Sequence, residues 1–194
     1  MRLSMLSPRR LAGVAALVCT AALTSACATA VTGPQAEVAA ARTPGCATSG
    51  LVIWMNTVGR AHAGGVSYTL KFTNLSGHAC TLYGYPGVYA VTLSGRPLGL
   101  PVIGGTIRPT TVTLANGATA TATLQITDPA HFGAACFLPG QAPAPGRPGK
   151  LPTAAGLRVT PPNPRQFASK VIPFPLSACY GIGPIWLHVT PVQI

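Results

Sequence analysis

Apolar and polar residues alternate along two stretches of the chain, which is the pattern of a β-strand with one buried face. In residues 66–73 the apolar positions are Val66, Tyr68, Leu70 and Phe72. In residues 118–126 every second residue is alanine, leucine or isoleucine, and the residues between are threonine or glutamine. Shorter apolar runs predict further strands at 51–57, 88–93, 156–160, 169–173 and 185–190.

Turn-forming residues separate these stretches at short intervals. The chain has 20 prolines and 22 glycines, and no window of a dozen residues has a helical period. Asn116-Gly117, between the threonine-rich run 110–114 and the strand 118–126, predicts a tight hairpin because both residues tolerate positive φ. Residues 137–150 are so rich in proline and glycine that we expect a long irregular loop. Together these features predict an antiparallel β-sandwich or barrel.

The first 27 residues have the order of a lipoprotein signal sequence. A basic start is followed by the apolar run 11–23, by the small residues 24–26 and then by Cys27. We therefore expect a signal peptide over 1–26 and lipid on Cys27, which would hold the chain at the outer face of the cytoplasmic membrane. Ordinary cleavage and secretion is the alternative. A retained anchor is disfavoured because the apolar run falls short of the roughly 20 residues that span a membrane.

The remaining chain fits a tether and one domain. Removal of 1–26 from the 194 residues leaves 168, and we expect a flexible stalk over 27–45 and a β-domain over 46–194. The only acidic residues are Glu37 and Asp128, whereas ten basic residues follow position 26, so the mature chain carries about +8. Such a charge attracts anionic wall polymer or lipid headgroups. Its even spread also suits plain solvation, and without interleaved aromatics it argues against nucleic acid.

Four cysteines remain after Cys27: Cys46, Cys80, Cys136 and Cys179. An even number in an exported chain predicts two disulfides, for which three connectivities exist. If the strand after Cys46 pairs with the strand that ends near Asn74, Cys46 comes close to Cys80, which leaves Cys136 for Cys179. No two of the four are close enough in sequence to form a zinc knuckle.

The residues that carry chemistry are sparse. Asp128 is the only carboxylate side chain in residues 46–194, so mechanisms that need a carboxylate pair are excluded, and Asp128-Pro129 reads as a turn after a strand. No Gly-x-Ser-x-Gly motif or cofactor fingerprint occurs. The histidines are isolated, and His188 alternates with Trp186 on the outward face of the last predicted strand. We expect no catalytic residues, no metal site and no cofactor.

Residues 74–88, Asn-Leu-Ser-Gly-His-Ala-Cys-Thr-Leu-Tyr-Gly-Tyr-Pro-Gly-Val, strongly resemble a family known as domain of unknown function 4232. Its pattern is a strand ending in Asn, a small loop, and Cys-Thr-Leu-x-Gly-aromatic-Pro-Gly-Val. Further pieces at 114–120, 157–162 and 187–192 fit in order, from about Cys46 onward. The resemblance implies an exported protein or lipoprotein of high-GC Gram-positive bacteria, with an immunoglobulin-like all-β fold and no assigned activity. The scarcity of acidic residues departs from the family and argues against a role that depends on carboxylates.

These observations lead to one expectation of function and one alternative. We expect a noncatalytic, monomeric lipoprotein that acts as a binding module in the cell envelope, with an envelope protein or anionic wall polymer as partner. Its candidate contact surface consists of Tyr83, Tyr85 and Trp186, although aromatic residues in such positions more often fill the core. The alternative is a secreted hydrolase or small-ligand carrier with a site near the loop 137–150.

Overall fold

The computed structural model describes residues 42–102, 104–163, 168–181 and 184–194, which lie within one compact unit, Ala41–Ile194. The predicted signal peptide and Cys27 lie outside the described residues, as does the stalk up to residue 41. The strands are β1 (Leu51–His62), β2 (Gly65–Asn74), β3 (Cys80–Tyr83), β4 (Gly87–Val91), β5 (Pro97–Val102), β6 (Thr111–Leu114), β7 (Thr119–Thr127), β8 (Thr153–Thr160), β9 (Lys170–Ser177) and β10 (Leu187–Val189). Two 3₁₀ segments accompany them, η1 (Thr48–Gly50) and η2 (Pro129–Ala135).

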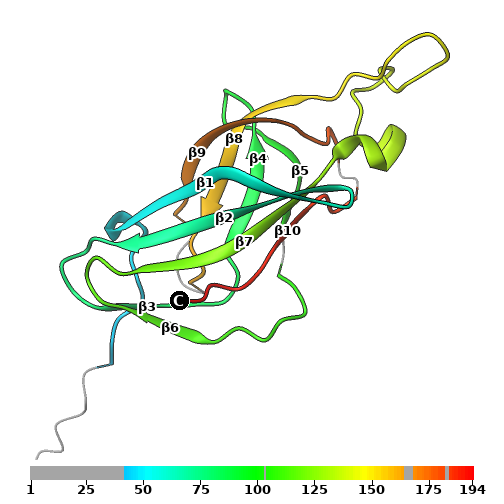
Figure 1. The fold of residues 1–194 in the computed structure, drawn as a ribbon. Coiled ribbons are helices and arrows are strands. Elements are labelled where there is room, and N and C mark those ends of the chain that lie inside the picture. The colour runs from blue at the N-terminus through cyan, green and yellow to red at the C-terminus, as the bar shows by residue number, and fades with distance from the viewer. Residues whose placement is uncertain (1–41, 103, 164–167, 182–183) are drawn as a thin grey trace, which may run out of the picture. The chain divides into compact units, whose positions relative to one another are not determined.

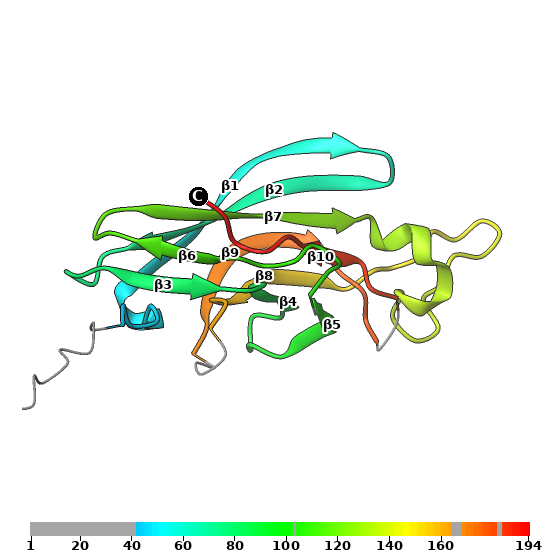
Figure 2. The same cartoon turned by 90° about the horizontal axis from the view of Figure 1, so that it is seen from below.

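The strands form two four-stranded antiparallel sheets and a two-stranded one. The first sheet has the order β1-β2-β7-β10, the second β5-β4-β8-β9, and β3 pairs with β6 (Figure 1). The first sheet lies across a common core from the second (Figure 2), and one cluster of buried side chains draws on both. The predicted all-β antiparallel sandwich with two disulfides is therefore confirmed. No helix in the described residues is long and apolar enough to cross a membrane.

The two alternating stretches form neighbouring strands at the centre of the first sheet. Strands β2 and β7 pair in register from Gly65 with Thr127 to Thr73 with Thr119. Their apolar side chains face the core, where Leu70 and Phe72 are fully buried. Their threonines lie on the outer face, so the sequence period of two decides which side of the sheet is buried.

The hairpin predicted at Asn116-Gly117 is wrong in its strand pairing. A turn is present, with Ala118 N donating to Ala115 O over 3.0 Å and Gly117 at φ +85°. Strands β6 and β7 on either side of it, however, lie in different sheets, because β6 pairs with β3 and β7 with β2. The turn residues allow the chain to reverse, but the partners of the flanking strands are set by packing.

Two strands, β3 and β5, were not among those predicted. Strand β5 contains Pro97 and Pro101 and lies at the edge of its sheet. The opposite edge, β9, contains Pro173 and Pro175, and it extends four residues beyond the predicted 169–173. Proline is tolerated at sheet edges because it has no N–H to offer a further strand, and it also blocks edge-to-edge association.

The disulfides join Cys46 to Cys80 and Cys136 to Cys179, which is the pairing inferred from the strand order. The first bond fixes the start of the domain to β3. Next to it, Thr81 N donates to Pro44 O over 2.8 Å and Cys46 N to Thr81 O over 2.9 Å. Pro44 and Gly45, the end of the predicted stalk, thus pair with β3.

Residues 137–150 form the expected irregular loop, which projects from the sandwich in Figure 1. The base of the loop is closed by Leu138 N, which donates to Lys150 O over 3.2 Å, and the tip by reciprocal hydrogen bonds between Ala144 and Arg147. Phe137 is buried at the base. The Cys136–Cys179 bond attaches the start of the loop to the segment after β9.

Candidate functional site

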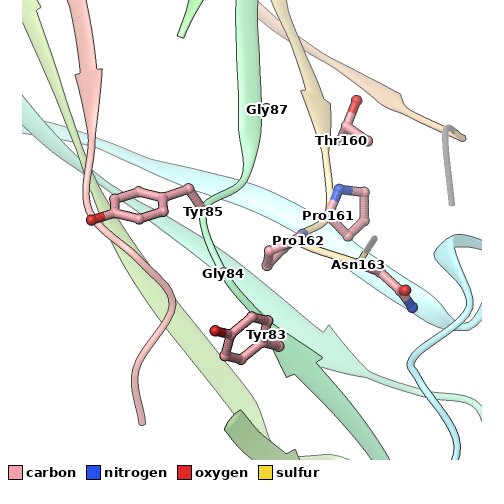
Figure 3. Close-up of a pocket in the computed structure, with 8 residues that line it drawn as sticks. All are labelled: Tyr83, Gly84, Tyr85, Gly87, Thr160, Pro161, Pro162 and Asn163. Carbon is pink, nitrogen blue, oxygen red and sulfur yellow. The ribbon is translucent and has the colours of Figure 1, made fainter. Parts of the chain in front are cut away.

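A hollow of about 440 Å³ lies where β3 ends, β4 begins and β8 ends (Figure 3). It is lined by Tyr83, Gly84, Tyr85, Gly87, Thr160, Pro161, Pro162 and Asn163. Two of the three predicted contact residues, Tyr83 and Tyr85, therefore lie at one site. Thr160 ends β8 of the second sheet and residues 161–163 follow it, so their place in the hollow could not be assigned from their position in the sequence.

Backbone contacts set the geometry of this hollow. Strand β3 ends at Tyr83, whose N–H donates to Pro162 O over 3.3 Å. Gly84 follows at φ +110°, a conformation that side-chain-bearing residues rarely adopt, and its carbonyl accepts from Val192 N over 3.1 Å. Gly87 then pairs with Thr160 at the start of β4. The chain thus passes from the two-stranded sheet to the second sheet through one fixed turn.

The two tyrosines have different roles. Tyr83 is 50% exposed, with its ring at the edge of the hollow. Tyr85 points away from Pro161 and Asn163 in Figure 3, and its hydroxyl donates to Ile107 O. A β-carbon at Gly105 would lie 3.1 Å from the Tyr85 ring, so this ring packs closely on the loop after β5. Tyr83 is therefore the more exposed of the two aromatic side chains.

Trp186, the third predicted contact residue, is wrong as a surface residue because its side chain is 0% exposed. The prediction began the last strand at residue 185, two residues before its observed start. Strand β10 begins at Leu187, and Trp186 precedes it with its carbonyl accepting from Thr127 N over 2.9 Å. Trp186 and Leu187 are consecutive and both buried, whereas His188 is exposed as expected.

The exposed tryptophan is Trp54, on the outer face of β1. Its side chain is 43% exposed, and Lys71 of the neighbouring strand places its ammonium nitrogen 4.3 Å from the ring centroid. The two residues are directly paired across β1 and β2. This contact is a cation–π interaction of the kind that contributes roughly 0.5–1 kcal/mol at exposed sites.

The lining of the hollow is suited to binding. Its described lining residues are tyrosines, prolines, glycines, a threonine and an asparagine, and they include no carboxylate, imidazole, thiol or amine. Aromatic and proline rings provide flat apolar surface, and the few polar side chains can fix the orientation of a ligand. Its chemistry offers contact area and hydrogen bonds but no nucleophile–base pair.

Asp128 is placed as the sequence predicted. Its carboxylate oxygen Oδ1 accepts from Ala130 N over 2.9 Å and starts the 3₁₀ segment η2. Asp128 also lines a second hollow, of about 300 Å³, together with Tyr68, Ile126 and Phe174. His131, the histidine closest in sequence, does not line it. The described part of the chain contains no group of three or more potential metal ligands.

Sequence reasoning missed this second hollow. The alternation places Tyr68 and Ile126 on the inner faces of two central strands, and Asp128 follows the second strand directly. That pattern indicates that the carboxylate of Asp128 lies close to apolar side chains at one end of the sheet. The residues of β9 in the wall, Phe174 among them, join these side chains only through the packing of the two sheets.

Several basic side chains make contacts within the domain. Arg158 Nη2 donates to Gly95 O over 3.4 Å, Arg147 Nη2 to Gly140 O over 2.9 Å, and Lys170 Nζ to Leu51 O. Lys71 lies over Trp54. These cations donate hydrogen bonds to backbone carbonyls or lie over an aromatic ring, so part of the positive charge is used in contacts within the domain.

The family model of a domain of unknown function (DUF4232) matches residues 46–193. Because the match covers well over half of the chain, the protein belongs to this family, and the resemblance seen in residues 74–88 is confirmed. No curated protein and no solved structure matches the chain.

Proposed function

We propose that this member of the DUF4232 family is a noncatalytic binding module of the bacterial cell envelope. In this proposal lipid on Cys27 holds it at the outer face of the cytoplasmic membrane, and the hollow beside Tyr83 receives an extended segment of an envelope protein. The observation that carries the proposal is the half-exposed ring of Tyr83 beside Pro161 and Pro162, in a hollow whose described lining has no reactive group.

The lining favours a protein segment over an anionic polymer. No lysine or arginine is among the described lining residues, so a phosphate-rich chain would find no counter-charge there. Tyrosine is enriched at protein interfaces because it combines a large rigid ring with a hydroxyl. Extended peptide segments commonly bind in grooves lined by aromatic residues.

Two observations support an extracytoplasmic address. The order of basic, apolar and small residues before Cys27 is typical of a lipoprotein signal. The four cysteines after it form two disulfides, which persist in oxidising compartments and are rare in the cytosol. Intact mass of the protein from the membrane fraction tests this address. We expect the chain from Cys27 plus a diacylglyceryl group, whereas a lipid-free chain would contradict the anchor.

The binding site is tested by site-specific crosslinking in the native envelope. A photoreactive phenylalanine analogue replaces Tyr83 in one variant and Tyr180 in a control. Tyr180 is 47% exposed and does not line the hollow, so the two positions are matched in residue type and exposure. We expect a defined protein to crosslink from position 83 and not from position 180. Equal products from both positions, or none from 83, would contradict the proposal.

The affinity of the crosslinked partner gives the quantitative test. With the purified partner, Tyr83→Ala is expected to raise the Kd about tenfold or more, because central interface tyrosines often contribute above roughly 1 kcal/mol. Tyr180→Ala is expected to leave the Kd within about twofold, since most residues outside a hot spot are near neutral. A Tyr83→Ala variant with unchanged Kd would place the binding site elsewhere.

A further inference from the structure

The second hollow lies at the opposite end of β8 and β9 from the Tyr83 hollow. Tyr83 lies near Thr160, at the end of β8, whereas Thr153, at the start of β8, pairs with Ser177. The second hollow is lined by Gly65, Val66, Tyr68, Ile126, Asp128, Pro129, Phe174, Pro175, Leu176 and Ser177. It therefore opens between the two sheets, with β2 and β7 on one side and β9 on the other.

The walls of this hollow are apolar and aromatic. Tyr68 from the first sheet meets Phe174 from the second edge-to-face, with 5.1 Å between ring centroids. Both rings are only partly buried, as are Ile126 and Leu176 beside them. The core is thus not fully closed at this end, and a ligand in the hollow would meet aromatic and aliphatic surface without any rearrangement of the sheets.

Asp128 supplies the one formal charge of this lining. Asp128 is the only carboxylate side chain in residues 42–194, whereas the same segment contains ten basic residues. Its position is fixed, because Asp128 N donates to Gly64 O over 2.9 Å while Oδ1 accepts from Ala130 N. No lysine or arginine lines the hollow, and within the described residues none forms an ion pair with this carboxylate.

We propose that this hollow binds a small organic cation, namely an ammonium group attached to an apolar or aromatic body. The carboxylate of Asp128 would accept a charge-assisted hydrogen bond from the ammonium, and Tyr68 and Phe174 would contact the body. A volume of about 300 Å³ lies at the small end of ligand sites, so one ring with a short alkylamine fits the available space. The proposal is independent of the partner site at Tyr83, with which this hollow shares no lining residue.

The test is a titration of the purified mature chain, followed by backbone amide chemical shifts. The probes are 2-phenylethylamine, its neutral analogue 2-phenylethanol and the anion 3-phenylpropionate. We expect the amine to bind with a Kd about threefold to fivefold below that of the alcohol, because only the ammonium gains the charge of Asp128, whose side chain is exposed. The anion should bind more weakly than the alcohol. Shifts should centre on β2, η2 and β9.

Three variants locate the site. Asp128→Asn keeps an oxygen that can accept from Ala130 N, so the fold should persist while the preference for amine over alcohol disappears. Phe174→Leu should weaken the amine and the alcohol alike, since it removes aromatic contact and not charge. Tyr83→Ala should leave all three affinities unchanged, which separates this site from the proposed partner site.

Specific outcomes would overturn the proposal. Equal affinity for amine and alcohol, an amine preference that survives Asp128→Asn, or shifts centred away from the hollow would each do so. Binding of the amine that is insensitive to Phe174→Leu would indicate a contact with the exposed charge of Asp128 alone, outside the hollow. A lysine-bearing protein segment that displaces the amine would assign the site to a macromolecule in place of a small cation.

Discussion

The side-chain amide of Asn74 donates a hydrogen bond to Leu114 O over 3.0 Å and so joins the last residue of β2 to the last residue of β6, although the two strands lie in different sheets. The same amide nitrogen reaches His78 O over 2.8 Å, and Oδ1 accepts from both the backbone and the hydroxyl of Ser76. Asn74 is 0% exposed. The buried side chain of Asn74 therefore connects β2 to β6, two strands that do not pair through their backbones.

We predict that Asn74→Ala destabilises the domain by about 3 kcal/mol, because buried backbone carbonyls lose their donor and cannot reach water. The control is Asn116→Ala. Asn116 is exposed and its Oδ1 accepts one bond, from Gly77 N over 2.9 Å, so we expect a loss of about 1 kcal/mol or less. Urea unfolding measures both variants. Similar losses of unfolding free energy in the two variants would show that the buried hydrogen bonds of Asn74 stabilise the domain no more than the exposed one of Asn116.

Asn74 also shows what sequence can and cannot predict in this fold. The alternation in 66–73 and 118–126 defines the strands and their inner faces, because each strand has one solvated side. The partner of β6 depends on Asn74 and on the Cys46–Cys80 bond, contacts between segments far apart in the chain. Local turn chemistry at Asn116-Gly117 holds no information about them, which is why the hairpin prediction was wrong.

The candidate sites, like the fold, could be predicted from the sequence only in part. Tyr83 could be picked out from its sequence, since it is an aromatic residue directly before the Gly-x-Pro-Gly turn of the segment that resembles the family, although the strand that ends at Tyr83 was not predicted. Pro161, directly after β8, and Phe174, on β9, line the two hollows and are brought there by the packing of the sheets. Trp186 was misplaced because a strand of three residues is too short for alternation to fix its start.

The two disulfides are predicted to contribute equally to stability. They close segments with sequence separations of 34 and 43 residues, for which the chain-entropy account gives about 4 kcal/mol each. Paired alanine substitutions, at 46 and 80 or at 136 and 179, should therefore cost similar free energies of unfolding in denaturant titrations. A difference well above 1 kcal/mol would show that native packing around one bond, and not loop closure, dominates.

Gly99→Ala is predicted to destabilise the domain by about 3 kcal/mol. Gly99 has φ +71°, and a β-carbon there would lie 2.6 Å from Trp186 Nε1. The control Gly117→Ala shares the positive φ, at +85°, but its β-carbon would meet nothing within 4 Å. The control should cost only the roughly 1–2 kcal/mol of the left-handed conformation. Thermal unfolding of both variants checks this, and equal losses would exclude the steric contact.

The two tryptophans are predicted to differ sharply in fluorescence quenching. Trp186 is buried, whereas Trp54 is 43% exposed and lies beneath the ammonium of Lys71. In Trp186→Phe, the remaining Trp54 should be quenched readily, and more strongly by iodide than by caesium, because the lysine attracts the anion. In Trp54→Phe, the remaining Trp186 should resist both quenchers.

Lys71→Gln supplies the decisive comparison for this last prediction. In the Trp186→Phe background it should reduce the iodide preference while leaving quenching by neutral acrylamide almost unchanged, since the exposure of Trp54 stays the same and only the nearby charge is lost. The iodide preference should also fall with added salt, because the pair lies at the surface and its field is screened within about 10 Å at 0.1 M. Equal quenching of the two single-tryptophan variants would contradict the burial of Trp186. An iodide preference that persists in Lys71→Gln would show that the general positive charge of the domain, and not Lys71, attracts the iodide.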